Sequence, residues 1–212
     1  MSWQYVITDS YPGYGTSEYE NNADMFASYF SGYMTVEAMA GILGNIQYES
    51  FMNPGQQELN RNGSTQYGYG LIQWTPASTF INWCNDRGFD WYDGDAQCYR
   101  IKCEGERVDG ASGYWLKNSA HGYVYTWSEF CQLTDYEEAC KAYFWERERG
   151  TWVDDRLDMA EDWYNYLNGS VPIPDPGPEP PDPGPSPSEY PLYYFGGVRD
   201  LMRRGVISDG KL

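Results

Sequence analysis

Proline most constrains how this chain can fold, because of where it is concentrated. Ten of the 13 prolines lie between Pro172 and Pro191, alternating with Asp, Glu, Gly and Ser. Proline fixes φ and lacks an N–H, so such a stretch favours an extended, semi-rigid spacer of roughly 20 residues that would reach on the order of 60 Å. The sequence therefore predicts a folded domain over residues 1–168, a Pro-rich linker over 169–191 and a short segment over 192–212.

The last 21 residues are too few to bury a core of their own. They combine apolar and basic side chains, among them Val198, Leu201, Arg203 and Arg204. We consider two interpretations, a docking peptide for a partner protein or surface, and the stub of a truncated second domain.

Charge and composition exclude several classes of function. The formal net charge of −17 argues against binding to nucleic acid or to an anionic membrane, since both require a surface rich in Lys and Arg. We expect no signal peptide, because the N-terminus lacks a basic region, and no apolar run approaches the roughly 20 residues that span a bilayer. With one histidine and no Cys-x-x-Cys pair, we expect no metal site and no cofactor. The five cysteines are expected to be buried thiols or to form disulfides: Cys84, Cys98, Cys103, Cys131 and Cys140.

Residues 36–49 predict an apolar helix that ends in a carboxylate. Thr35 can cap this helix, and Ile42, Ile46 and Glu49 fall at positions i, i+4 and i+7 along it. Glu49 should therefore project from the face that packs into the core. Because partial burial disfavours the charged form of a carboxylate, such a side chain can act as a general acid.

The rest of the pattern predicts a mainly α domain, of the α+β class, with a small β-hairpin. Ser17 and Glu20 predict a capping box at the start of a first helix. Asn62-Gly63 predicts a hairpin turn that leads into residues 70–74. Further helices are expected near Phe80, over residues 97–103, from Thr126 to Arg147, and over residues 155–167.

Four residues are candidate substrate contacts. Tyr69 stands between two glycines that would let the chain approach a ligand closely. The amides of Gln73 and Asn45 can donate and accept hydrogen bonds. The ring of Trp74 suits the apolar face of a sugar.

Two motifs together resemble a known family. Residues 41–50 (GILGNIQYES), followed by residues 68–78 (GYGLIQWTPAS), are similar to the phage tail lysozyme family, within the superfamily of goose-type lysozymes and lytic transglycosylases. The likeness covers about residues 18–167. Glu148-Arg149 resembles the Glu-Arg-Pro element of the family, with Gly150 in place of the proline. The resemblance implies a lysozyme-like helical domain with the hairpin beside a sugar cleft.

The resemblance also implies an activity. The expected enzyme is a muramidase that cleaves the β-1,4 bond between N-acetylmuramic acid and N-acetylglucosamine, with Glu49 as general acid. A second carboxylate is not evident, because Glu58 is the only acidic residue between Ser50 and Gln73 and it matches no motif of the family. A lytic transglycosylase needs a single Glu, since the 6-hydroxyl of the substrate attacks, so this alternative stays open.

Two other classes of function fit the sequence less well. A non-catalytic glycan-binding module would suit the aromatic content and the spacer, but it has no reason to place Glu49 at the end of a buried stripe. A cysteine amidase would need one of the thiols to pair with His121, and no motif supports the pairing.

The resemblance further implies where the protein acts and what it meets. A wall-degrading phage protein without a signal peptide would be packaged in the virion tail, or would act as an endolysin released to the wall at lysis. The expected partners are the glycan strands of peptidoglycan and, through residues 192–212, phage tail proteins.

A chain truncated after Leu167 should fold and keep its activity on soluble glycan fragments, because every motif of the predicted site precedes the spacer. Circular dichroism and the release of sugar products would measure the two properties. Loss of both would mean that the tail is part of the folded structure.

Overall fold

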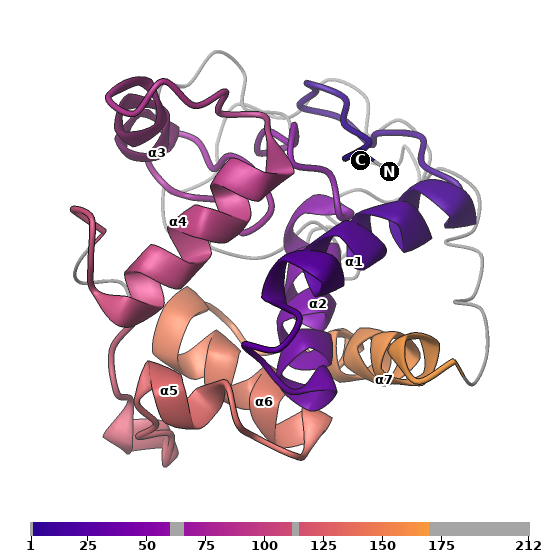
Figure 1. Ribbon diagram of the computed structural model, residues 1–212, viewed down its shortest axis with the longest axis vertical. Coiled ribbons are helices and arrows are strands. Elements are labelled where there is room, and N and C mark those ends of the chain that lie inside the picture. The colour runs from indigo at the N-terminus through magenta and orange to yellow at the C-terminus, as the bar shows by residue number, and fades with distance from the viewer. Residues whose placement is uncertain (1, 60–65, 112–114, 170–212) are drawn as a thin grey trace, which may run out of the picture.

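The computed structural model describes residues 2–59, 66–111 and 115–169, shown in Figure 1. This part of the chain is mainly helical and contains isolated β-bridges but no longer strand. A short 3₁₀ helix, η1 (Ser119–His121), and a π-helical turn, η2 (Phe144–Glu148), accompany the α-helices. The α-helices are α1 (Thr16–Phe30), α2 (Val36–Ser50), α3 (Ala77–Asn85), α4 (Gly94–Glu106), α5 (Trp127–Phe130), α6 (Tyr136–Tyr143) and α7 (Asp155–Leu167).

Helix α2 runs through the middle of the molecule and packs against α1, α6 and α7 (Figure 1). Two glycines let its neighbours approach closely. A Cβ on Gly41 would lie 2.6 Å from the backbone nitrogen of Cys140 in α6, and one on Gly44 would lie 2.6 Å from the carbonyl oxygen of Arg156 in α7. Any larger side chain would push these helices apart. The glycines therefore fix how α6 and α7 sit against the helix that carries Glu49.

The predicted start of α2 is confirmed, and the helix ends at Ser50, one residue beyond the predicted end. Thr35 is the N-cap, and its hydroxyl accepts the N–H of Ala38 at 3.1 Å. At the other end, Phe51 and Met52 have φ values of 55° and 62°, in the left-handed region that non-glycine residues rarely adopt. Both side chains are buried, so packing compensates for this backbone conformation. The chain therefore turns into the core immediately after the last turn of α2.

The segment that follows α2 is irregular. Isolated bridges join Thr8 to Gln56, Gln57 to Tyr69, and Tyr69 to Trp74. The predicted turn at Asn62-Gly63 lies outside the described residues, so the hairpin stays a prediction. The bridge to Thr8 shows that the N-terminal residues lie against this segment.

Two predicted helix boundaries are wrong. Helix α1 begins at Thr16 instead of after Ser17, because Glu18 reaches back to accept the N–H of Gly15 at 3.1 Å. The helix expected from Thr126 to Arg147 is interrupted after Phe130. It resumes at Tyr136, because the carboxylate of Asp135 accepts two backbone N–H groups there and starts a new helix.

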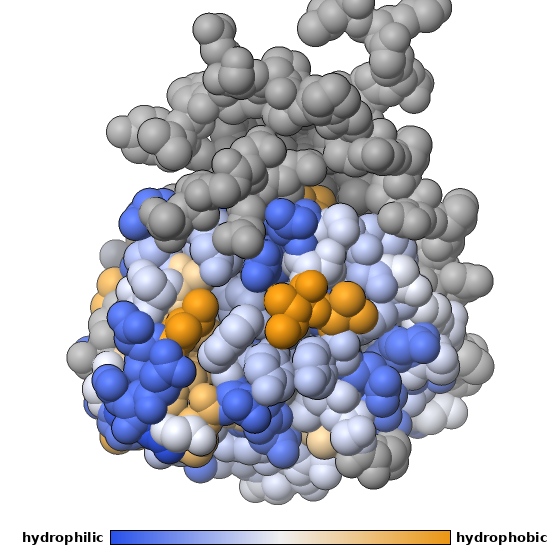
Figure 2. Space-filling model, turned by 90° about the horizontal axis from the view of Figure 1, so that it is seen from above, coloured by the Kyte–Doolittle hydropathy of each residue, from blue (hydrophilic) through white to orange (hydrophobic). Residues whose placement is uncertain are grey.

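The surface and the thiols agree with the composition. The face seen in Figure 2 is mostly hydrophilic, with small separate hydrophobic patches.

All five cysteines are buried free thiols, which confirms the interpretation that they are buried thiols and not disulfides. Among the described residues, no helix combines the length and the apolar character needed to cross a membrane.

Candidate active site

Glu49 lies in the last turn of α2, where its side chain is 12% exposed. Ile42 and Ile46, which precede it on the same stripe of the helix, are fully buried. The carboxylate is therefore largely enclosed by protein and still reaches the surface, as a group that exchanges protons with a bound substrate must do.

Arg156, near the start of α7, is the counter-ion of Glu49. Its guanidinium is 1% exposed, and its Nη2 donates to Oε1 of Glu49. Its Nη1 donates to Oδ1 of Asn45 at 2.9 Å. The rings of Tyr48 and Phe144 lie 4.2 Å and 4.8 Å from the central carbon of the guanidinium. A buried arginine thus joins α7 to the end of α2 and stabilises the negative charge of Glu49.

Two further carboxyl groups lie within electrostatic reach of Glu49. Glu58, in the segment after α2, accepts the N–H of Gly68 at 3.0 Å. Burial raises the pKa of Glu58, and the charge of Glu49 adds to the increase. Glu148 is the last residue of η2, and burial together with the charge of Glu49 raises its pKa to about 7, against the opposing effect of Arg147. Glu58, which matches no motif of the family, is therefore close enough to Glu49 for the charge of Glu49 to act on it.

Gln73 lies next to Gly68, whose N–H Glu58 accepts, and its amide is turned toward the backbone. The side chain is partly exposed, and φ is 50°, in the left-handed region. Its Nε2 donates to the carbonyl oxygens of Gln56 at 3.3 Å and of Gly70 at 2.9 Å. These bonds fix the orientation of the amide, so its oxygen is the atom left to meet a ligand.

The other three predicted contacts are buried. Asn45 is 0% exposed and donates to the carbonyl oxygens of Gly41 and Cys140. Tyr69 is 0% exposed, and Trp74 is 3% exposed and stacks on Phe80 at 4.2 Å between ring centroids. All three side chains face protein in this structure, so a role in substrate binding stays a prediction for each of them.

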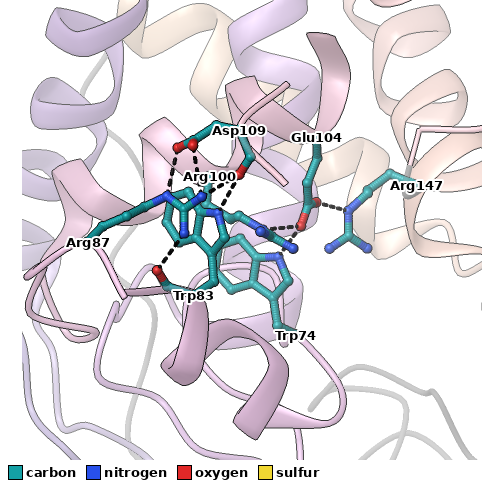
Figure 3. A network of polar contacts seen from close by, with 7 residues as sticks. All are labelled: Trp74, Trp83, Arg87, Arg100, Glu104, Asp109 and Arg147. Carbon is teal, nitrogen blue, oxygen red and sulfur yellow. Dashed lines mark hydrogen bonds and ion pairs between the residues drawn. The ribbon is translucent and has the colours of Figure 1, made fainter. Parts of the chain in front are cut away.

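Trp74 belongs to a buried polar network centred on Glu104 of α4 (Figure 3). Glu104 is 1% exposed and accepts the indole N–H of Trp74 at 2.7 Å. It also accepts the Nε groups of Arg100 and Arg147, each at 2.8 Å. Because Arg147 directly precedes Glu148, the network ties the segment that carries Trp74 to the helix end that carries Glu148.

Arg156 and Glu148 were missing from the residues predicted as the site. Glu148 had a signal in the sequence, since Glu148-Arg149 was part of the family resemblance. Arg156 had a weaker signal, because it is the charged residue of the otherwise apolar stripe of α7. A charge on a packing face indicates a buried partner, but the pattern does not identify that partner.

Comparison with known proteins gives two findings. The model of a family described as phage tail lysozyme matches residues 20–167. The chain is also 34% identical over 140 residues to a protein called morphogenesis protein 1 from Bacillus phage B103. That alignment covers 64% of this chain and 36% of the phage protein, so the chain spans little more than a third of the length of this relative.

Glu146, a second acidic residue of η2, should make the stability of the fold depend on pH. Glu146 is 0% exposed, and burial raises its pKa from 4.5 to about 7. Between these pH values the folded protein holds a proton that the unfolded chain has lost, so stability should fall as the pH rises from 4.5 to 7. Glu146→Gln should reduce this pH dependence by on the order of 2 kcal/mol.

Urea unfolding of the parent and the variant at several pH values would measure the effect. Glu148 titrates in the same range and should leave part of the dependence in place. An equal loss of stability with pH in both proteins would contradict the prediction.

Proposed function

This chain belongs to the phage tail lysozyme family, and from that premise we propose that its folded domain cleaves the β-1,4 bond between N-acetylmuramic acid and N-acetylglucosamine in peptidoglycan. Glu49 is the proposed general acid. The observation that carries the proposal is the setting of Glu49, a 12% exposed carboxylate whose charge Arg156 stabilises and which has other carboxyl groups within electrostatic reach.

In the proposed first step, the protonated Glu49 donates its proton to the glycosidic oxygen as the bond from carbon to oxygen breaks. The electron pair of that bond stays with the leaving oxygen, and positive charge develops on the remaining sugar ring. Glu49 becomes a carboxylate in this step. Arg156 is already oriented toward its Oε1, so the charge that forms meets a donor that needs no rearrangement.

Glu58 supports hydrolysis over transglycosylation. In hydrolysis a second carboxylate activates water or stabilises the positive charge on the sugar. Glu58 is held by the N–H of Gly68 and is close enough to Glu49 for the charge of one to affect the other. In the alternative, a lytic transglycosylase, Glu49 alone would donate the proton and then take one from the 6-hydroxyl of the substrate.

A glycan-binding module without activity is less well supported. Such a module needs exposed aromatic rings against which sugars can stack. Tyr69 and Trp74, the rings predicted to contact a sugar, are 0% and 3% exposed. The polar groups gathered around Glu49 have a clearer use in proton transfer than in stacking.

The glycan strands of peptidoglycan are the proposed substrate, and the virion is the proposed location. The name of the Bacillus phage relative, morphogenesis protein 1, supports a place in the virion. Residues 192–212 are the proposed docking segment for phage tail proteins. Action as an endolysin, released to the wall at lysis, is the alternative.

The products should carry reducing sugar ends, because the nearby Glu58 favours attack by water. Mass spectrometry of digested peptidoglycan would identify them. Products dominated by 1,6-anhydro-N-acetylmuramic acid would instead establish a lytic transglycosylase.

Glu49→Gln should lower the rate of hydrolysis at least about a hundredfold, because an amide cannot donate the proton that the leaving oxygen requires. Binding to intact cell walls should survive. Glu37→Gln, at the opposite end of the same helix, is the matched control and should keep the parent rate.

The substitution at Glu49 removes the partner of the buried Arg156 charge. Loss of one partner from a buried ion pair destabilises the folded protein. Circular dichroism must therefore show that the variant is folded at the assay temperature. A folded variant that cleaves peptidoglycan as fast as the parent would remove Glu49 from the mechanism.

A further inference from the structure

Three tryptophans are partly exposed, and two of them lie beside the candidate active site. All nine tryptophans of the chain are within the described residues, and six are buried: Trp3, Trp74, Trp83, Trp115, Trp127 and Trp163. The other three, Trp91, Trp145 and Trp152, are partly exposed. An indole ring is usually buried, because its large apolar area is costly to leave in water. Trp145 and Trp152 flank the same buried side chain, Phe144.

Phe144 connects this pair of rings to the candidate acid. Its ring lies edge-on to Trp145 at 4.8 Å and to Trp152 at 5.2 Å between ring centroids. The same ring lies 4.8 Å from the central carbon of the Arg156 guanidinium, which donates to Glu49. Each step from Glu49 to the two indoles is therefore a direct contact between neighbouring side chains.

A hydrogen bond fixes the orientation of Trp152. Its indole N–H donates to Oδ1 of Asp154 at 2.9 Å. Asp154 is the N-cap of α7, a position where a carboxylate usually accepts a backbone N–H of the first turn. Within the described residues its carboxylate makes no such capping bond and holds the indole instead. A ring that is already held in one orientation loses little conformational entropy when a ligand stacks on it.

Trp145 is covered on one face by His121. The exposed imidazole stacks on the indole with 3.6 Å between ring centroids and 8° between the ring planes. The side-chain amide of Asn118 donates to the carbonyl oxygen of Trp145 at 3.0 Å, which keeps the turn around His121 in place. His121 therefore extends the aromatic surface outward from Trp145. We call Trp145, Trp152 and His121 the aromatic platform.

The surroundings of the aromatic platform suit a sugar. Exposed polar side chains lie on both segments that carry its rings: Lys117, Ser119, Thr151 and Asp154. A hexosamine has an apolar face of C–H groups and a rim of hydroxyl and amide groups. It therefore binds best where aromatic rings and polar groups lie side by side.

We propose that the aromatic platform is a subsite for the glycan strand of peptidoglycan, in which the apolar faces of N-acetylhexosamine rings stack on its exposed rings. The inference rests on the proposed function, because it takes peptidoglycan to be the substrate. It provides exposed rings for the sugar, which Tyr69 and Trp74 do not offer at 0% and 3% exposure. A glycan strand extends to both sides of the bond that is cleaved, so it needs contacts beyond Glu49 itself.

The test measures binding separately from cleavage. In the Glu49→Gln protein, isothermal titration calorimetry with soluble glycan strands of peptidoglycan would give Kd. Adding Trp152→Ala should weaken binding about tenfold, as the loss of one stacked ring would. Trp152→Phe keeps a ring and should recover most of the affinity. Phe89→Ala is the matched control and should leave Kd unchanged, because this 37% exposed ring packs on Trp83 and Tyr99.

Activity gives a second measurement. With Glu49 intact, Trp152→Ala should raise KM about tenfold and leave kcat within about twofold, because a sugar bound away from the reacting atoms is held equally in the ground and transition states. Asp154→Ala releases the indole and should raise KM by a smaller factor.

Two results would overturn the inference. Unchanged glycan binding in Trp152→Ala, or an equal loss in Phe89→Ala, would leave the aromatic platform to a protein partner. A fall in kcat with KM unchanged would mean that Trp152 supports the packing around Arg156 and does not bind substrate. Failure of the proposed function is a separate result, since it would appear as a folded Glu49→Gln protein that still cleaves peptidoglycan.

Discussion

The burial of Arg156 is the constraint on which the arrangement of the site depends. A guanidinium that is 1% exposed must have its positive charge compensated inside the protein. Glu49 meets the charge, Asn45 accepts a second N–H, and two aromatic rings cover the faces of the group. Helix α7 can bring Arg156 this close because Gly44 of α2 has no side chain to hold it away. The close packing of α2 against α7 therefore also determines the orientation of Glu49.

The strong acidity of the chain makes the placement of its arginines informative. There are 14 basic and 31 acidic side chains, so positive charge is scarce. Even so, Arg100, Arg147 and Arg156 are largely removed from solvent, and each is paired with a glutamate. Buried pairs of this kind contribute little net stability, because desolvation offsets their attraction. Their effect here is on geometry, since they fix the orientations of Glu49, Glu104 and the end of η2 relative to each other.

The sequence was sufficient where the signal is local. Helices α2 and α7 follow from their apolar stripes, and the cap at Thr35 from a hydroxyl placed before the first turn. The position of Glu49 at the end of α2 is part of the same pattern. The helix expected from Thr126 to Arg147 failed for a local reason too, because the capping preference of Asp135 outweighed the continuing periodicity.

The sequence did not predict which side chains pair across the core. Trp74 looked like a sugar contact because it follows Gln73 in the motif, but its indole donates to Glu104, 30 residues away in the chain. Glu49 and Arg156 are separated by 107 residues, and no pattern within either helix pairs them. Glu58 matches no local motif, whereas in the fold it accepts the N–H of Gly68 and is affected by the charge of Glu49. Periodicity predicts which face of an element is buried, but the partner across the core depends on the whole fold.

The burial of acidic side chains in η2 makes the stability of the fold depend on pH. Glu146 and Glu148 lie two residues apart on η2, and burial raises the pKa of both to about 7. For Glu146 the consequence is a fold that is more stable when this group is protonated. For Glu148 the consequence is a carboxyl group that holds its proton at a higher pH than usual. The burial of this short acidic turn, which directly follows α6, therefore favours the folded state below neutral pH.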